Sequence, residues 1–427
     1  MKIAVISNAG MLVDLVYLLQ LEGHEVDMFV NNLQAMRIGV GLVDMKELDK
    51  DVDFDKYDFI IVDDVYFGDY ASELRKKGKI VVGGSVDTDA WENNRFVGME
   101  IMKRCEIEVP ETKEFDSYKE AFEFAKNSDK LYVIKHSGKE GLVKGKTIVP
   151  VSREEMLYFL RKLKDVDGLR FVFQEKIDGV EIAMGAWFNG SEFVGDLNYN
   201  LEHKRMFDGD MGALCGESGT VSVMSEDWGL FYDKGLGKCK RFLELAKYVG
   251  YIDLNCILTE DGKLYGLEFT CRPGWPIFQI IARQWEFGSI GEMLFKIGKG
   301  EKAGRYVSED KRYGIGVCFF TETQYGEVPI TVEGLDADNV DSEIKEWIGL
   351  DDVWFDRENE MFVSVTGSQW YSRNLVGVGV GDYFSRVKDD VYKYMKRIKS
   401  TFGWYRNDIG DRYYKQADIV RNFIRDF

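Results

Sequence analysis

The sequence predicts an α/β protein that begins with an open, mostly parallel sheet and continues into strand-rich α+β segments. Strand and helix patterns alternate over the first hundred residues, which is the βαβ rhythm of a Rossmann-like domain. After residue 105 the pattern changes to strands separated by glycine loops. No internal repeat, low-complexity segment or Pro/Gly/Ser-rich linker interrupts the chain, so we expect its domains to pack together.

The first region supplies short apolar runs with one clear helical spacing between them. Runs of this length predict buried strands, and apolar residues three to four apart predict a helix. The expected strands are 2–7 (KIAVIS), 25–30 (EVDMFV), 57–64 (YDFIIVDD) and 79–84 (KIVVGG), and the expected helices are 11–22 and 95–105 (RFVGMEIMKRC).

Two further regions are rich in strands. Residues 131–151 and 169–188 contain strands broken by glycine loops, and an amphipathic helix is expected over about 152–164. Strand patterns continue to about residue 272. A third region opens at 313 (YGIGVCFF), includes MFVSVTG and NLVGVGVG, and closes with a helix over about 383–399 and a polar, aromatic tail.

Composition limits the classes of partner. The net charge of −18, from 56 basic and 74 acidic residues, repels phosphate backbones and argues against general nucleic-acid binding. Any anionic ligand must therefore be held by a local group of cations, loop amides or a metal ion. Six scattered cysteines without a CxxC pair suit free thiols in a reducing cytosol. With no run of about 18 apolar residues and no secretory signal pattern, we expect a cytoplasmic protein without a membrane segment.

The stretch VIKHSGKEGLVKGKT is a candidate phosphate-binding loop. A strand ends near Lys135, and Gly138, Gly141 and Gly145 interrupt a loop that also carries Lys139, Lys144 and Lys146. Glycines let backbone N–H groups approach phosphate oxygens, and lysines supply point charges. The loop is not a Walker A motif. A flexible charged hairpin is the alternative interpretation of this stretch alone.

The stretch FVFQEKIDGVEIAM is a candidate adenosine site. An apolar strand leads into Gln174, Glu175, Lys176 and Ile177, where free backbone beside apolar side chains can bind an adenine ring. A carboxylate such as Glu181 can accept hydrogen bonds from both ribose hydroxyls. Considered alone, a β-turn with a solvated acid is the more common explanation.

The stretch YIDLNCILTEDGKLYGLEFTCRPG predicts a hairpin that turns at residues 260–262. Strand alternation places Asp253 with Asn255 on one face, and Glu268 with Thr270 and Arg272 on one face. Oxygen ligands of this kind suit Mg²⁺ in a site completed by substrate phosphates. A structural Glu268–Arg272 ion pair is the alternative.

The stretch EHKRMFDGDMGALCGESG, residues 202–219, packs cations, acids and glycines together. It is either a charged surface loop or a site for a charged ligand. Together with the three preceding stretches it resembles the ATP-grasp ligases, and within them the phosphoribosylamine–glycine ligase family. The resembling motifs are HKRxxDGDxG (His203 to Gly212), EKIDGVE, LEFTCRPG and YRNDIG (Tyr405 to Gly410). The resemblance extends from the first strand to about residue 410.

The resemblance implies a role for each matching residue. Arg95 lies where the family usually has a phosphate-contacting lysine, and Lys135, Gly138, Gly141 and Lys144 belong to the strand and lid loop that contact nucleotide phosphates. Gln174 to Ile177 would bind adenine, and Glu181 the ribose. The implied metal ligands are Glu268, Thr270 and Asn255, and the implied catalytic or substrate-binding residues are Lys204, Arg205, Asp208, Asp210, Gly212 and Arg272.

The resemblance also implies a reaction. A substrate carboxylate attacks the γ-phosphate of ATP to give an acyl phosphate, and an amine then displaces phosphate to form an amide. In that family the substrates are glycine and phosphoribosylamine, in purine biosynthesis. The implied cofactors are ATP and Mg²⁺ or Mn²⁺, and we expect a monomer or homodimer with small-molecule substrates. The resemblance also implies four regions in the chain. They are a Rossmann-like domain (1–110), an ATP-grasp domain (111–312, with a lid over about 111–178), an α+β domain (313–410) and a tail (411–427).

Departures from the family pattern gather at substrate positions. The glycine loop GSGGREHA is SNAGMLVD here, PNTGGMG is ALCGESG, and EFNARFGDPE is EFTCRPGWPI. Thr270 thus replaces a ligating asparagine, a change for which Asp253 or Asn255 can compensate. The alternatives to the family reaction are a ligase that joins a different amino acid to a different amine, and a nucleotide-binding protein without catalysis.

Overall fold

A parallel five-stranded sheet forms the N-terminal part of the protein, in the order β3-β2-β1-β4-β5. The computed structural model describes residues 1–49, 51–137, 147–164, 170–365 and 369–427. Alternate residues of β1 face two different apolar cores, which explains why this strand is apolar throughout. The strands are β1 (Lys2–Ser7), β2 (Glu25–Val30), β3 (Met45–Glu47), β4 (Phe59–Val62) and β5 (Val81–Val82), with helices α1 (Val13–Leu21), α2 (Gly68–Lys76), α3 (Val86–Asn93) and α4 (Arg95–Arg104). The strands and helices predicted for this region are confirmed.

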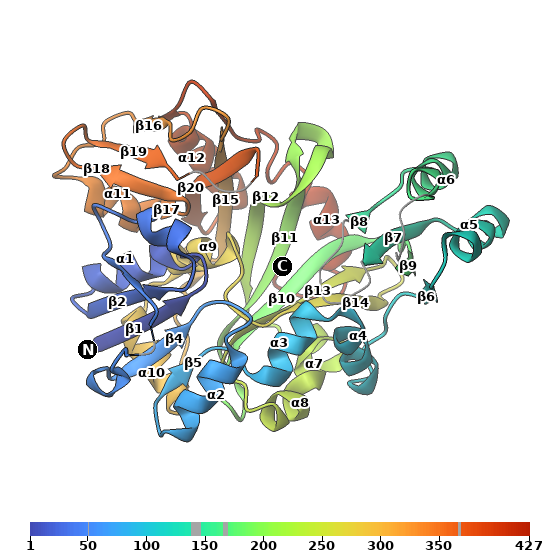
Figure 1. The fold of residues 1–427 in the computed structure, drawn as a ribbon, viewed down its shortest axis with the longest axis horizontal. Coiled ribbons are helices and arrows are strands. Elements are labelled where there is room, and N and C mark those ends of the chain that lie inside the picture. Colours follow the sequence, from blue (N-terminus) through green and yellow to red (C-terminus); the bar gives the residue numbers. More distant parts are fainter. Residues whose placement is uncertain (50, 138–146, 165–169, 366–368) are drawn as a thin grey trace.

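A small antiparallel sheet follows and projects from the rest of the molecule (Figure 1). Its order is β6-β9-β7-β8, and two helices cover it. It has an apolar core of its own, built around Ile134, Phe171 and Phe173. The elements are β6 (Thr112–Phe115), α5 (Tyr118–Asn127), β7 (Tyr132–Ser137), β8 (Thr147–Ile148), α6 (Arg153–Lys162) and β9 (Arg170–Glu175). We call this unit the lid.

The largest sheet joins the middle of the chain to its C-terminal part. Its order is β14-β13-β10-β11-β12-β15-β20-β17, with β22 paired to β15. Because β15 pairs with β12, the C-terminal region continues this sheet. The strands are β10 (Val180–Phe188), β11 (Phe193–Phe207), β12 (Met211–Ser225), β13 (Gly250–Leu258), β14 (Leu264–Thr270), β15 (Tyr313–Glu322), β17 (Ile348–Leu350), β20 (Tyr371–Gly381) and β22 (Gly403–Trp404).

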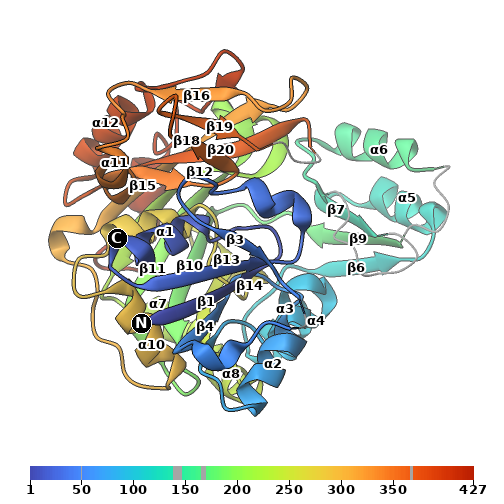
Figure 2. The ribbon, with the colours of Figure 1, turned by 60° about the vertical axis from the view of Figure 1, so that its left-hand side comes forward.

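Another four-stranded sheet and several helices complete the C-terminal part (Figure 2). The sheet has the order β18-β19-β16-β21. Its strands are β16 (Pro329–Val332), β18 (Val353–Asp356), β19 (Met361–Ser364) and β21 (Ile398–Lys399). The remaining helices are α7 (Gly229–Asp233), α8 (Lys240–Leu245), α9 (Ile277–Gln284), α10 (Ile290–Gly298), α11 (Val340–Glu346), α12 (Phe384–Met395) and α13 (Tyr413–Val420).

The tail after Gly410 is packed against the body of the protein. Helix α13 and the residues after it bury Tyr413, Val420 and Phe427 in the main core. The Asp426 carboxylate accepts hydrogen bonds from Ser225 Oγ (2.6 Å) and from the Glu226 N–H (2.8 Å). The tail therefore stabilises one end of β12.

Two expectations drawn from composition can be compared with the structure. All six cysteines are buried, and none of them forms a disulfide within the described residues, as their spacing predicted. Within the described ranges, no helix combines the length and apolarity needed to span a bilayer.

Candidate functional site

One face of the large sheet carries polar side chains on two pairs of strands, β13 with β14 and β11 with β12, which lie on either side of β10. The pairing places Asn255 opposite Glu268 and Asp253 opposite Thr270. On β10 the partners of Asn255 and Asp253 are Ala183 and Gly185, whose small side chains leave this face open. We call this set the polar floor: Asn198, Asn200, Glu202 and Lys204 on β11, Thr220 and Ser222 on β12, Asp253 and Asn255 on β13, and Glu268 and Thr270 on β14. The two pairs predicted from strand alternation, Asp253 with Asn255 and Glu268 with Thr270, do share a face.

Part of the polar floor is held by its own hydrogen bonds. Asn198 Nδ2 donates to Ser222 Oγ (2.7 Å), and Asn200 Nδ2 donates to Asp253 Oδ2 (3.0 Å). Other buried oxygens have no hydrogen-bond partner among the described residues, namely Asn200 Oδ1, Thr220 Oγ1, Asp253 Oδ1, Asn255 Oδ1 and, beside the floor, Glu217 Oε1. Because buried polar atoms are normally paired, this concentration of acceptors indicates a ligand-binding surface.

Lys204 lies among three carboxylates. Its Nζ atom is 3.0 Å from Glu181 Oε1, 2.9 Å from Glu202 Oε2 and 4.0 Å from Glu268 Oε1. Burial alone would lower the pKa of Lys204, but the charges of Glu202, Glu181 and Glu268 raise that pKa well above its usual value. The ammonium group is therefore charged and partly neutralises an acidic site.

The surrounding carboxyl groups are harder to ionise than usual. Burial is the main cause for Glu217, and nearby Glu202 adds to it, so the pKa of Glu217 is well above its ordinary value. Burial and the charge of Glu202 raise the pKa of Asp253 to about 7. Burial likewise raises the pKa of Glu202, while Lys204 opposes the shift.

The predicted nucleotide residues lie where the lid meets the large sheet. Lys135 Nζ donates to Gln174 Oε1 at 2.6 Å, which links β7 to β9. Glu175 ends β9 and pairs with Lys130 at 2.8 Å. The chain then passes through Lys176 and Ile177 into β10, which carries Glu181 as its second residue. Gly138, Gly141 and Lys144 lie outside the described residues.

Arg95 approaches the same site from the N-terminal part. It is the first residue of α4, and Asn94 caps that helix by accepting hydrogen bonds from the N–H groups of Phe96 and Val97. Burial lowers the pKa of Arg95, and the nearby Glu268 carboxylate opposes the shift. Arg95 and Lys204 thus both lie near Glu268, which places two cations around the predicted metal ligand.

The predicted metal ligands meet a simple test of fit. Asn255 and Glu268 are cross-strand partners, and Asn255 Oδ1 is buried without a partner among the described residues. Within the described ranges no three His, Cys, Asp or Glu residues are grouped to hold a metal ion by themselves. Mg²⁺ commonly binds through one or two carboxylates and completes its shell with substrate phosphates. The donor set therefore fits Mg²⁺ bound together with a nucleotide.

Arg272 is held by acids from the N-terminal part. Its Nε atom donates to Glu92 Oε1 (3.2 Å) and lies 3.7 Å from Asp64 Oδ1. The Glu92 carboxylate also accepts the Cys271 N–H at 2.7 Å. Neighbouring Asp63 is fully buried; burial and the adjacent Asp64 raise its pKa to about 8. Asp63 also accepts the Leu12 N–H at 3.1 Å, so this acid contacts the segment that replaces the family's glycine-rich loop.

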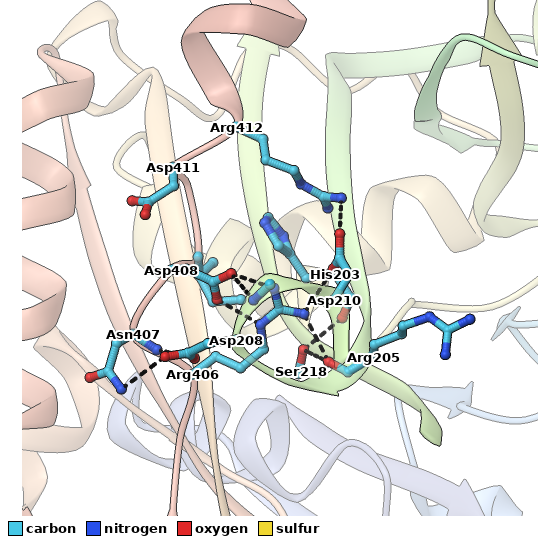
Figure 3. Close-up of polar contacts among 12 residues, drawn as sticks. His203, Arg205, Asp208, Asp210, Ser218, Arg406, Asn407, Asp408, Asp411 and Arg412 are labelled. Carbon is cyan, nitrogen blue, oxygen red and sulfur yellow. Dashed lines mark hydrogen bonds and ion pairs between the residues drawn. The ribbon is translucent and has the colours of Figure 1, made fainter. Parts of the chain in front are cut away.

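The DGD turn is bound to the C-terminal segment rather than left at the surface (Figure 3). Arg406 donates to both oxygens of Asp408 (2.8 Å each), to Asp210 Oδ1 (3.0 Å) and to the Arg205 carbonyl (2.9 Å). Arg412 donates to the other Asp210 oxygen at 2.5 Å, and Asp208 accepts the Asn407 N–H at 2.8 Å. We call this group the clasp: Asp208, Asp210, Arg406, Asn407, Asp408 and Arg412. Both aspartates predicted to bind substrate are therefore engaged within the protein.

The backbone of the turn requires its glycines. Gly209 and Gly212 have φ values of 66° and 80°, in the left-handed region that glycine adopts without strain. Asp210 also has a positive φ of 56°, which aspartate tolerates better than most residues. The Gly209 N–H donates to Asp408 Oδ2 at 2.8 Å, so the turn is shaped to fit the clasp.

Two other residues of the HKRxxDGDxG motif, His203 and Arg205, make contacts within the protein. His203 is buried, and burial with the charges of Arg412 and Arg406 lowers its pKa to about 3, so its ring is neutral. Arg205 points away from the clasp in Figure 3 and donates to the Gly212 carbonyl at 2.8 Å. The hairpin β11–β12 is thus fixed at its tip, and Lys204 lies on the side that faces the polar floor.

The clasp supports a prediction about stability. The Arg406 side chain is only 1% exposed. Replacing it with methionine removes the cation that pairs with Asp408 and the donor to the Arg205 carbonyl, and leaves Asp210 paired with Arg412 alone. We expect Arg406→Met to lower the free energy of unfolding by about 3–5 kcal/mol, measured by urea denaturation. Arg386→Met, on the exposed face of α12, serves as the matched control and should change it little. An Arg406→Met protein as stable as the wild type would contradict the role of the clasp.

Several site residues were not identified from the sequence. The residues Asn198, Asn200 and Glu202 alternate with apolar residues in LNYNLE, a visible signal for a polar face of a strand. Glu92, Asp64 and Arg406 gave no such signal, because their partners are distant in the chain. Glu217 also gave none, since it lies in the segment without family likeness.

Comparison with known proteins agrees with this arrangement. Residues 94–276 match the family described as phosphoribosylglycinamide synthetase, ATP-grasp (A) domain. A phosphoribosylamine–glycine ligase from Halalkalibacterium halodurans is 24% identical over 357 residues, covering 79% of this chain and 78% of that protein. One from Leptospira interrogans is 23% identical over 372 residues, covering 81% and 80%. The crystal structure of phosphoribosylamine–glycine ligase from Thermotoga maritima superposes with a TM-score of 0.69 at 19% identity, covering 96% of this chain and all of that one.

The chain has an ATP-grasp fold with an N-terminal Rossmann-like part and a C-terminal α+β part. Among ATP-grasp enzymes, the chain resembles phosphoribosylamine–glycine ligases in both sequence and fold.

Proposed function

We propose that the protein is an ATP-dependent carboxylate–amine ligase that forms an amide through an acyl phosphate, in the manner of phosphoribosylamine–glycine ligase. One observation supports this function above the others. Lys204 of the signature motif lies within 4.0 Å of both Glu181, the predicted ribose ligand, and Glu268, the predicted metal ligand. Three motifs that are far apart in the sequence thus meet at one point, where a nucleotide with its metal ion would have its reacting end.

In this proposal ATP binds between the lid and the polar floor. Gln174 to Ile177 contact adenine, Glu181 accepts the ribose hydroxyls, and Lys135 and Arg95 neutralise phosphate charge. Glu268 and Asn255, with Thr270 beside them, hold Mg²⁺ or Mn²⁺, which when bound draws negative charge from the phosphates. Binding of ribose to Glu181 frees Lys204 from one of its carboxylate partners.

The chemistry then needs positioning and charge neutralisation more than a protein nucleophile. A substrate carboxylate oxygen attacks the γ-phosphorus as the bond to ADP breaks, and Lys204 stabilises the charge that develops on the transferred group. Arg272, held by Glu92 and Asp64, orients the acyl phosphate. The amine nitrogen attacks the acyl carbon, phosphate leaves, and the nitrogen loses a proton. Asp208, Asp210, Gly212 and Arg205 position the hairpin that carries Lys204.

Glycine and phosphoribosylamine are the first substrates to test, because the relatives are named for that pair. A second candidate pair of substrates is another amino acid with another amine. The acids near the segment that replaces the family's glycine-rich loop favour this second pair. Asp63 is fully buried, and Asp64 and Glu92 both form ion pairs with Arg272. Such surroundings suit a phosphate group less well than a glycine-rich loop does.

We expect purified protein to release ADP from ATP and Mg²⁺ only when a suitable carboxylate and amine are both present. The measurement is coupled ADP release with glycine plus phosphoribosylamine, compared with a panel of other amino acids and amines. Omission of either partner is the control. Absence of ADP release across the whole panel, from protein that still binds ATP, would contradict the ligase function and leave a nucleotide-binding protein.

A further inference from the structure

Glu217 is a buried acid that none of the roles described so far uses. It lies on β12 within Ala213–Gly219, the segment that departs from the family pattern. The residue is only 7% exposed, and its Oε1 atom has no hydrogen-bond partner among the described residues. A carboxylate in such surroundings is costly unless it meets a cation or a donor.

The local backbone fixes the place of this acid. Gly216 has a positive φ of 82°, which turns the chain just before Glu217. Just after it, Ser218 Oγ is within hydrogen-bond distance of the carbonyl oxygens of His203 (2.8 Å) and Arg205 (2.7 Å). The segment is thus tied to β11 on both sides of Lys204, and Glu217 is held beside the polar floor.

The groups that influence Glu217 are mostly acids. Glu202, Asp253 and Glu181 act on it as like charges, and Lys204 is the nearby cation. Lys204 itself contacts Glu181 and Glu202 directly, at 3.0 and 2.9 Å. One lysine is therefore shared among several acids, and a cation bound beside Glu217 would favour the ionised form of its carboxyl group.

The neighbouring polar atoms can all accept hydrogen bonds. Asp253 Oδ1, Asn200 Oδ1 and Thr220 Oγ1 are buried without partners among the described residues. A group with several N–H donors and a positive charge satisfies such a set, as an ammonium does.

We propose that Glu217 is a specificity-determining residue that binds the positively charged amino group of the carboxylate substrate. The substrate class is then the amino acids, in which the ammonium lies one or a few carbons from the carboxylate. This geometry is suitable because Lys204 and Glu268 mark the place where the carboxylate meets the γ-phosphate, and Glu217 lies beside Lys204. The inference rests on the proposed ligase function and adds the residue that selects the substrate.

The test uses hydroxylamine as the amine, so that the natural acceptor need not be known. Hydroxylamine attacks the acyl phosphate to give a hydroxamate and releases phosphate. A colour reaction measures the hydroxamate, and ADP release measures formation of the acyl phosphate. The carboxylates are the twenty common amino acids and their amine-free counterparts, such as glycolate for glycine and lactate for alanine. The enzymes are the wild type, Glu217→Gln, and Glu244→Gln as a surface control on α8.

We expect the wild type to use at least one amino acid and to reject its amine-free counterpart. Glu217→Gln should raise the KM for that amino acid on the order of 100-fold, because a buried charged pair is lost, and should leave the KM for ATP unchanged. Glu244→Gln should behave as the wild type. An unchanged KM for the amino acid in Glu217→Gln would overturn the proposal, as would equal use of the amine-free compound by the wild type.

Calorimetric binding separates failure of this inference from failure of the ligase function. The same amino acids are titrated into protein saturated with Mg²⁺ and a non-hydrolysable ATP analogue. Amino-acid binding that Glu217→Gln weakens, without ADP release by the wild type, supports the subsite and contradicts the ligase function. Binding that is equal in the two proteins, or absent from both, overturns the subsite. Thermal unfolding of both proteins verifies that the isosteric change leaves the fold intact.

Discussion

A Glu268→Gln enzyme is expected to release ADP about 1,000-fold more slowly than the wild type while keeping nearly the same stability. Glutamine preserves the shape of the side chain and removes the negative charge that a divalent ion requires. The side chain is 34% exposed, so the fold does not depend on its ionisation as it would for a fully buried acid. The loss should therefore appear in turnover and in the concentration of Mg²⁺ needed for half-maximal rate.

The measurement is steady-state ADP release at saturating ATP with varied Mg²⁺ or Mn²⁺, together with urea unfolding. Glu244→Gln is the control for a change of one surface charge. A Glu268→Gln protein that unfolds would support a structural ion pair instead of a metal ligand. Full activity in the variant would exclude Glu268 from the site altogether.

Replacement of Lys204 by methionine is expected to lower both stability and activity. The change leaves Glu181, Glu202 and Glu268 without their shared cation. Loss of one partner from a buried ion pair costs about 3–5 kcal/mol, and because the Lys204 side chain is 27% exposed we expect about 2–3 kcal/mol. Mg²⁺ with an ATP analogue should restore part of this stability, since it supplies positive charge at the same place.

Urea unfolding with and without Mg²⁺ and the ATP analogue measures this effect. Lys302→Met is the matched control, because Lys302 pairs with Glu192 at 3.5 Å while 83% exposed. The restored stability in Lys204→Met should exceed the ligand-induced gain of the wild type. Equal gains in the two proteins would contradict the view that Lys204 balances the acids of the metal and ribose sites.

The sequence allowed much of the fold to be predicted, because local patterns determine it. The apolar run 2–7 became β1, the helical spacing in 11–22 became α1, and the turn at 260–262 joins β13 to β14. Alternation correctly placed Asp253 with Asn255, and Glu268 with Thr270. That the two pairs share one face of the sheet follows from the pairing register, which the structure supplies.

The contacts that complete the site could not be predicted in this way. Asp210 meets Arg406 and Arg412 across about two hundred residues of sequence, and neither side of that contact shows its partner locally. Arg272 belongs to a motif in which Glu268 was the only acid considered as its partner, yet Glu92 and Asp64 come from the N-terminal part. The irregular pairing of β11 with β12 near residue 203 also breaks simple alternation, so the burial of Glu217 follows only from the three-dimensional structure.

The β11–β12 hairpin divides two tasks along its length. Its tip, from Arg205 to Gly212, is bound to the C-terminal segment through the clasp, whereas the segment from Cys215 to Thr220 borders the polar floor. A mutation at the tip would mainly affect the stability of the protein. A mutation near Glu217 would mainly affect which substrate the protein binds. A lineage could therefore acquire a new substrate by drift in the second segment while the scaffold is inherited unchanged.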